Sequence, residues 1–317
     1  MLRALLLHLM AMLALGPIAL AQIKKPPLPP GRDPGGVAIA LLTTGIDYTV
    51  PEVARRLARD GEGELIGFDL IDNDNRPFGD SRAQTPAHWG GDATALALDL
   101  LDPAIGARLV PVRVDPRDPA SLARAVAFVA RTPARVVVVP MWSPSKEDWQ
   151  PFRLAVERFP QILFVVAAGD DGKDLDKQPA YPAALGLPNL LVVTAARAVA
   201  AGQLSARLLD TANWGAKTVD AVAVAANSAL AAAAAAKAVA ALLAREPGLD
   251  GAALKQWLFQ SSPLEREGET PQRTRTLSIL VASMLRPTRG LLDPAGRILD
   301  KARIPERLQE PRDGKTR

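Results

Sequence analysis

Short runs of apolar residues, separated by stretches with helical spacing, limit the folds open to this chain more than any other feature. In these runs apolar residues do not alternate with polar ones, as they would in a strand with one solvent-exposed face. The runs occupy residues 37–42, 109–114, 136–139, 162–168 and 190–194. The helical stretches between them are 51–59, 121–131 and 149–159. Strands that are apolar on both faces and alternate with helices favour an α/β fold with a mostly parallel central sheet and helices on both faces.

The most strongly helical segment is residues 228–244, SALAAAAAAKAVAALLA, which contains good helix formers and neither Gly nor Pro. Its single charged residue is Lys237, so the helix is apolar almost all round. A helix with such a surface is normally buried, and its small side chains let neighbouring elements approach closely. We therefore expect this helix at the centre of the fold, with residues 221–225 as a strand that leads into it.

Composition excludes several kinds of functional site. The 317 residues include no Cys and two His, His8 and His88. This excludes disulfides, thiol catalysis, zinc ribbons, iron–sulfur clusters and multi-histidine metal sites, and it leaves His88 as the one histidine in the expected folded region. The net charge is +4 without a basic block, so we expect no nucleic-acid partner.

The N-terminus has the pattern of a secretory signal: an arginine, an apolar run, a Gly-Pro break and Ala-Leu-Ala before Gln22. The apolar run is shorter than the ~20 residues that span a membrane, so we expect residues 1–21 to be a cleaved signal peptide. The mature chain would be exported, periplasmic or secreted, with no membrane span after cleavage. Residues 22–35 are expected to form an extended Pro-rich linker, and residues 301–317 a charged, disordered tail.

Short motifs follow one another along residues 36–300. They read TTGID at 43–47, GFD at 67–69, GDATALA at 91–97, AAGDDG at 167–172, YPA at 181–183, NWG at 213–215 and SAL at 228–230, where the alanine-rich helix begins. In order and spacing these segments resemble those of the subtilisin-like serine peptidases, families S8 and S53. The resemblance covers nearly the whole expected mature chain and implies one domain over 36–300 with a three-layer subtilisin-like fold.

The same resemblance assigns the positions of a catalytic triad, and none of them carries the family's catalytic residue. The Asp position is Thr43, the His position is Asp92 and the Ser position is Leu230. Threonine cannot stabilise an imidazolium, aspartate is a far weaker base than histidine, and leucine offers no nucleophile. The oxyanion-binding Asn position is Asp170, whose carboxylate would repel a developing oxyanion. The chain therefore resembles a peptidase family but is predicted to be inactive.

Two neighbouring residues offer a rearranged site. His88 lies shortly before Asp92, and Ser228 lies shortly before Leu230. A serine that enters a helix is a favoured N-cap, and we expect that role for Ser228; for His88 we expect a surface or packing role in a Gly-rich loop. A dyad of Ser228 with Lys237 is excluded because the two lie about 13–14 Å apart along the helix axis.

An acidic turn upstream of these motifs offers oxygen ligands. Asp69, Asp72 and Asp74 stand close together in a stretch that also contains Asn73 and Asn75. Such a set could hold calcium; the alternative, which we prefer, is a solvated turn with hydrogen bonds from side chain to backbone. No other cofactor is predicted.

Three functions are compatible with these observations. The first, which we favour, is an exported, catalytically inactive pseudopeptidase that binds a peptide or protein partner by strand addition. The second is an active serine-type endopeptidase with a rearranged site that uses His88. The third is a structural or assembly protein whose cleft is filled by Trp89, Trp142 or Leu230.

Overall fold

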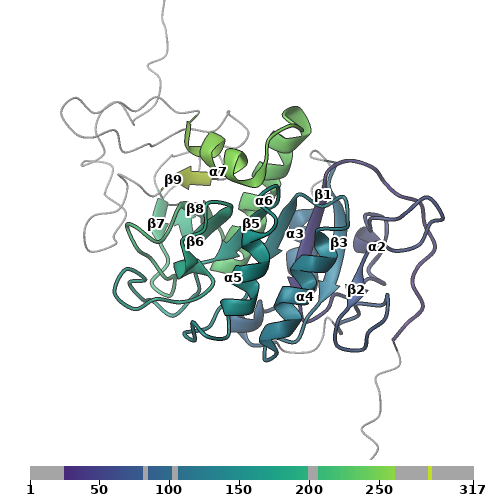
Figure 1. The fold of residues 1–317 in the computed structure, drawn as a ribbon, viewed down its shortest axis with the longest axis horizontal. Coiled ribbons are helices and arrows are strands. Elements are labelled where there is room, and N and C mark those ends of the chain that lie inside the picture. The colour runs from purple at the N-terminus through teal and green to yellow at the C-terminus, as the bar shows by residue number, and fades with distance from the viewer. Residues whose placement is uncertain (1–24, 81–84, 102–105, 199–205, 261–284, 288–317) are drawn as a thin grey trace, which may run out of the picture.

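The computed structural model describes residues 25–80, 85–101, 106–198, 206–260 and 285–287, which form a sheet between two layers of helices (Figure 1). The expected signal peptide (1–21), the start of the expected linker (22–24) and the charged tail (301–317) lie outside the described residues. The architecture below therefore concerns the region that resembles the subtilisin-like peptidases and the part of the linker that precedes it.

The centre of the structure is a nine-stranded sheet with the order β2-β3-β1-β4-β5-β6-β8-β9, in which β7 pairs with β6 off this path. The strands are β1 (Ala38–Thr43), β2 (Phe68–Asp69), β3 (Arg108–Arg113), β4 (Val136–Val139), β5 (Leu163–Ala167), β6 (Leu190–Ala198), β7 (Ala206–Leu208), β8 (Ala221–Val224) and β9 (Leu285–Pro287). All pairs are parallel except β6–β7 and β8–β9. The predicted, mostly parallel sheet is confirmed.

The valine strand β4 shows why its sequence is apolar throughout. Val136 and Val138 belong to the buried cluster on one face of the sheet, and Val137 and Val139 belong to the cluster on the other face. All four side chains are 0% exposed. Because side chains alternate between the two faces of a strand, a strand that is covered on both sides has no position for a polar residue.

Helices cover both faces of the sheet, as predicted (Figure 1). The first face packs against α3 (Ala93–Leu100), α6 (Ser228–Arg245) and α7 (Gly251–Gln260), and the second against α4 (Pro119–Val129) and α5 (Gln150–Glu157). Three shorter helical turns are α2 (Pro51–Ala54), η2 (Ala87–Trp89) and η3 (Ala183–Leu185).

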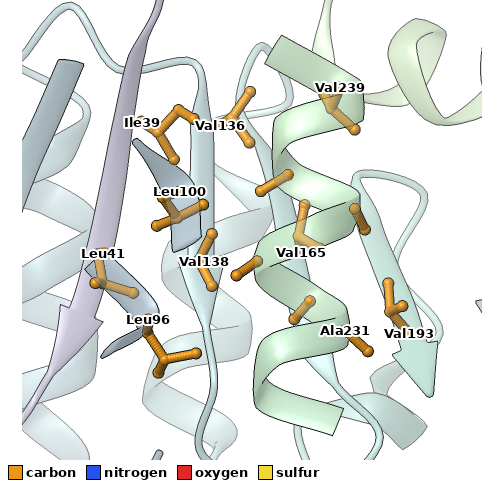
Figure 2. Close-up of a cluster of buried hydrophobic side chains, with 14 of the residues drawn as sticks. Ile39, Leu41, Leu96, Leu100, Val136, Val138, Val165, Val193, Ala231 and Val239 are labelled. Carbon is orange, nitrogen blue, oxygen red and sulfur yellow. The ribbon is translucent and has the colours of Figure 1, made fainter. Parts of the chain in front are cut away.

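The alanine-rich helix α6 is the central helix that the sequence predicts. Ala231 and Val239 lie in one buried cluster with the strand residues Val165 and Val193 (Figure 2). Lys237 is 8% exposed and forms an ion pair with Asp99 of α3, with Nζ 3.2 Å from Oδ1. By length and composition α6 could also cross a membrane, but 72% of it is buried inside the fold, which is the state of a core helix.

Two local predictions need correction. Helix α2 covers only Pro51–Ala54 of the predicted stretch 51–59, because the following residues pair with β3: Ala58 N donates to Leu109 O and Leu109 N donates to Arg56 O, both at 2.8 Å.

Residues 25–35 contain neither helix nor strand, as predicted. They do not hang free as a linker, however, since several of them bond to the domain.

Candidate functional site

Ligands of open parallel sheets bind beyond the carboxyl ends of the strands, and the residues singled out in the sequence lie at this edge. Thr43 is the last residue of β1, and Asp170 follows β5. The first residue of α6, Ser228, meets the loop after β5 through hydrogen bonds to Gly169 and Asp170. The fold therefore brings Asp170 and Ser228 together.

Ser228 is 0% exposed, and its hydroxyl has two partners. The hydroxyl donates to Asp170 Oδ2 at 2.8 Å and accepts from the backbone N–H of Gly169 at 3.1 Å. The prediction that Ser228 caps the helix is wrong. Asn227, in an extended conformation, is the N-cap and accepts from Leu230 N at 2.8 Å, which leaves Ser228 as the first helical residue with its side chain bonded to the loop after β5.

Asp170 lies at the amino end of the central helix. Its carboxylate accepts from the backbone N–H of Ser228 at 3.0 Å as well as from the hydroxyl. Burial raises the pKa of Asp170 above its usual range, the hydrogen bonds from Ser228 oppose that shift, and the neighbouring Asp171 adds to it. A helix amino terminus favours a negative charge. In this fold, that place is taken by a carboxylate of the chain itself.

Asn213, which is completely buried, stabilises the loop that carries Asp170. Asn213 Nδ2 donates to Ala168 O at 2.9 Å, and Oδ1 accepts from the backbone N–H groups of Asp171 and Lys173 at 3.0 and 2.9 Å. A Cβ at Gly169, where φ is +99°, would lie 2.5 Å from Asn213 Nδ2. The sequence showed Asn213 only as part of a motif and did not reveal this supporting role.

Trp142 packs against the same loop. It is 4% exposed, its Nε1 donates to Asp171 Oδ2 at 3.1 Å, and its ring is 3.0 Å from where a Cβ of Gly169 would lie. The backbone N–H of Trp142 donates to His88 O at 3.0 Å. The next residue, Ser143, exchanges two backbone hydrogen bonds with Tyr181, at 3.0 and 2.8 Å. The backbone donors of Trp142 and Ser143 are thus used inside the fold.

The other residues at the triad positions have structural roles. Thr43 is 1% exposed, and its hydroxyl accepts from Gly45 N at 3.3 Å. Asp92 is exposed and caps α3 by accepting from Thr94 N and Ala95 N. Leu230, which is partly buried, packs against the apolar core.

His88 is exposed in η2, and its ring meets Trp89 edge-on with 5.5 Å between centroids. In the part of the chain that the structure describes, no hydrogen bond joins the His88 ring to Ser228, whose hydroxyl is bonded to Gly169 and Asp170. The structure therefore does not bring the two residues of the predicted rearranged site together as a base and its nucleophile.

The three predicted calcium ligands do come together, but they surround a cation of the protein. Lys25 Nζ lies 2.6 Å from Asp69, 2.7 Å from Asp72 and 3.1 Å from Asp74. Arg113 Nη1 contacts Asp69 and Asp72, each at 2.8 Å. Within the described ranges, no group of three or more His, Cys, Asp or Glu is arranged to hold a metal ion. The ammonium group lies where a calcium ion, the less favoured alternative, would have been held.

Known structures resemble this fold although the sequence is distant. A cold adapted subtilisin-like serine proteinase superposes with a TM-score of 0.53 and 18% identity, over 76% of this chain and 86% of the other. A lanthipeptide protease superposes with a TM-score of 0.55 and 16% identity, over 74% of this chain and 84% of the other. The fold is subtilisin-like. The chain matches no family model and no curated protein, and identities this low extend to the fold alone.

Proposed function

We propose that this chain is a non-catalytic protein with a subtilisin-like fold, a pseudopeptidase. The observation that carries the proposal is the state of Ser228, a buried hydroxyl bonded to Asp170 and to the backbone of Gly169. A serine nucleophile needs an adjacent base and access to substrate. The proposal is further supported by Asp92, the residue at the family's histidine position, whose carboxylate is engaged as a helix cap.

The electrostatics of this edge also favour a non-catalytic role. Acyl transfer requires donors that point at a developing negative charge. Here the backbone N–H of Ser228 already binds the Asp170 carboxylate. An anionic intermediate would have to displace a charge of the same sign that the chain supplies itself. This supports inactivity independently of the residues at the triad positions.

The test is labelling of the folded chain with a fluorophosphonate, with an active subtilisin-like protease as the positive control. We expect no labelling of the parent chain. Labelling that disappears in Ser228→Ala or His88→Ala would overturn the proposal and favour an active hydrolase. Circular dichroism of each variant verifies that the comparison is made between folded proteins.

We further propose that partners bind outside the carboxyl edge, so that the role is structural or assembly-related and not capture of a peptide strand. Strand addition needs free backbone donors and acceptors. The backbone N–H of Trp142 and both backbone groups of Ser143 are already bonded within the fold. Selection of displayed peptides against the folded chain tests this. Peptides that crosslink to residues 140–144 would contradict this proposal and favour the peptide-binding function.

We propose export on the pattern of residues 1–21, which has the regions of a secretory signal. Expression of the full chain in a Gram-negative host and sequencing of the N-terminus of the exported fraction tests this. A mature chain that begins at Gln22 is expected. A product that keeps residues 1–21 in the cytoplasmic fraction would contradict the proposal.

A further inference from the structure

Residues 25–35 follow the surface of the domain at the right-hand side of Figure 1 and bond to it at Lys25, Pro26, Pro29 and Asp33. Five prolines in this segment stiffen the chain and leave it without helix or strand. Its contacts are therefore made by side chains and by carbonyl groups. They divide into an anchor at Lys25, a middle part and an anchor at Asp33.

The first anchor is the ammonium group of Lys25. It is bound by Asp69, Asp72 and Asp74, and the Lys25 side chain is only 11% exposed. Asp69 is completely buried and also accepts from Arg113 at 2.8 Å. Removal of Lys25 would leave Asp69 and Asp72 with the Arg113 guanidinium and would take from Asp74 the ammonium group that it contacts. Loss of one partner from a partly buried ion cluster is destabilising. The cluster therefore holds Lys25 by charge.

The middle part is held by carbonyl groups. Tyr48 Oη donates to Pro26 O at 2.7 Å, and Arg59 Nη2 donates to Pro29 O at 2.5 Å. Gly31 packs closely against the Arg59 guanidinium, since a Cβ at Gly31 would be 3.1 Å from Arg59 Nε. Leu28 is partly buried against the apolar core. These contacts hold the segment in place once it lies along the domain. Each of them is a single hydrogen bond or a small area of contact.

The second anchor is Asp33. Its carboxylate accepts from Arg59 N at 2.8 Å, from Arg108 Nη1 at 2.6 Å and from Gly35 N at 2.7 Å. These hydrogen bonds lower the pKa of Asp33, although burial by itself would raise it. The chain then passes through Gly35 into β1, so this end is tied directly to the central sheet.

We propose that residues 25–35 are a strap with a releasable latch at Lys25 and a fixed hinge at Asp33. The strap opens from the Lys25 end as a local event while the sheet stays folded. Opening frees the middle contacts in turn and uncovers the acidic turn at 69–74. Asp33 keeps its bonds because β1 holds the chain beside Arg59 and Arg108.

Thiol labelling of Leu28→Cys tests the proposal, because the chain has no other Cys and Leu28 packs against the apolar core while the strap is closed. When opening is fast, the reagent reacts only with the opened segment, so the labelling rate follows the open population. We expect Lys25→Ala to be labelled at position 28 at least about tenfold faster than the parent chain with the same probe, because three carboxylates lose their shared ammonium group.

Lys177→Ala is the matched control. It removes the same charge, but the Lys177 side chain is 75% exposed and pairs with Asp174, so labelling at position 28 should keep the parent rate. Lys25→Gln retains a donor of similar length without the charge and should lie between parent and Lys25→Ala. This variant also serves if Lys25→Ala does not fold.

Two results would overturn the proposal. The first is labelling at position 28 at the parent rate in both Lys25 variants, with circular dichroism showing that they are folded. The second is labelling that accelerates only in proportion to global unfolding, measured in urea on the same variants, since opening would then be global unfolding and not release of a latch.

Discussion

Replacement of Ser228 by alanine tests whether this residue is a structural lock, as its bonds imply. The change removes one bond that the hydroxyl donates to the Asp170 carboxylate and one that it accepts from Gly169 N–H. The carboxylate keeps the backbone N–H of Ser228, at 3.0 Å. The Gly169 N–H, in contrast, loses its partner beside a side chain that is 0% exposed, so little water can replace the hydroxyl.

The size of the effect follows from these two losses. A hydrogen bond to a charged group contributes about 1.5–3 kcal/mol, and a buried donor without a partner costs about 1–3 kcal/mol. The two terms share one hydroxyl and do not simply add. We therefore expect Ser228→Ala to lower the free energy of unfolding by about 2–4 kcal/mol.

Urea unfolding followed by tryptophan fluorescence and by circular dichroism measures this difference. Ser145→Ala is the control, because the Ser145 hydroxyl accepts one bond from Asp148 N in an exposed stretch; it should cost less than about 1 kcal/mol. A Ser228→Ala chain within about 0.5 kcal/mol of the parent, the range of ordinary surface substitutions, would refute the reasoning. Such a serine would be dispensable for the fold, and a functional role for it would have to be considered again.

Three further outcomes follow from the structure. Burial raises the pKa of Asp170, so its contribution to stability is complete below the unfolded pKa of 3.8 and is lost as the pH rises through the folded pKa. The free energy of unfolding of the parent, relative to Asp170→Asn, should therefore increase on acidification by about 1.4 kcal/mol per unit of pKa elevation. A difference that stays constant with pH in urea titrations would contradict this. Burial by itself would lower the pKa of Lys25, but hydrogen bonds to its three carboxylates raise this pKa above 10.5. The contribution of Lys25 to stability is therefore complete below pH 10.5 and is lost as the pH rises through the folded pKa. The difference in free energy of unfolding between the parent and Lys25→Ala should narrow in alkaline solution, and a difference that widens there would argue against the latch. Ala235→Leu on α6 inserts a larger side chain where the alanine is 0% exposed, which should cost about 1–3 kcal/mol; an unchanged midpoint of thermal unfolding would mean that the helix does not pack closely on the sheet.

The sequence predicts the sheet and the central helix because both are recorded in local patterns. A run such as Val136–Val139 has a single good solution, a strand that is buried on both faces. The position of Asp170 was also predictable, since the Ala-Ala-Gly-Asp stretch begins at the last residue of a strand. These features depend on residues that are neighbours in the chain.

The roles of Ser228 and Lys25 depend on residues far away in the sequence. Asn227 and Ser228 are both good capping residues, and only the contact with Asp170, which is 58 residues away, decides which one caps α6. Counting back along a helix made mostly of alanine gave Leu230 as the nucleophile position, but alanines provide no landmark. In the fold it is Ser228 that meets Asp170. Lys25 finds its carboxylates 44, 47 and 49 residues further on, where no local pattern points.

The order in which the strands are joined has a consequence for synthesis. Strand β1 lies between β3 and β4, so neither of its edges is paired until a ribosome has passed residue 113. One face of β4, β5 and β6 waits longer, because α6 covers it and α6 ends at Arg245. Nascent chains that stop before residue 228 carry this apolar face bare, and such intermediates aggregate or need a chaperone.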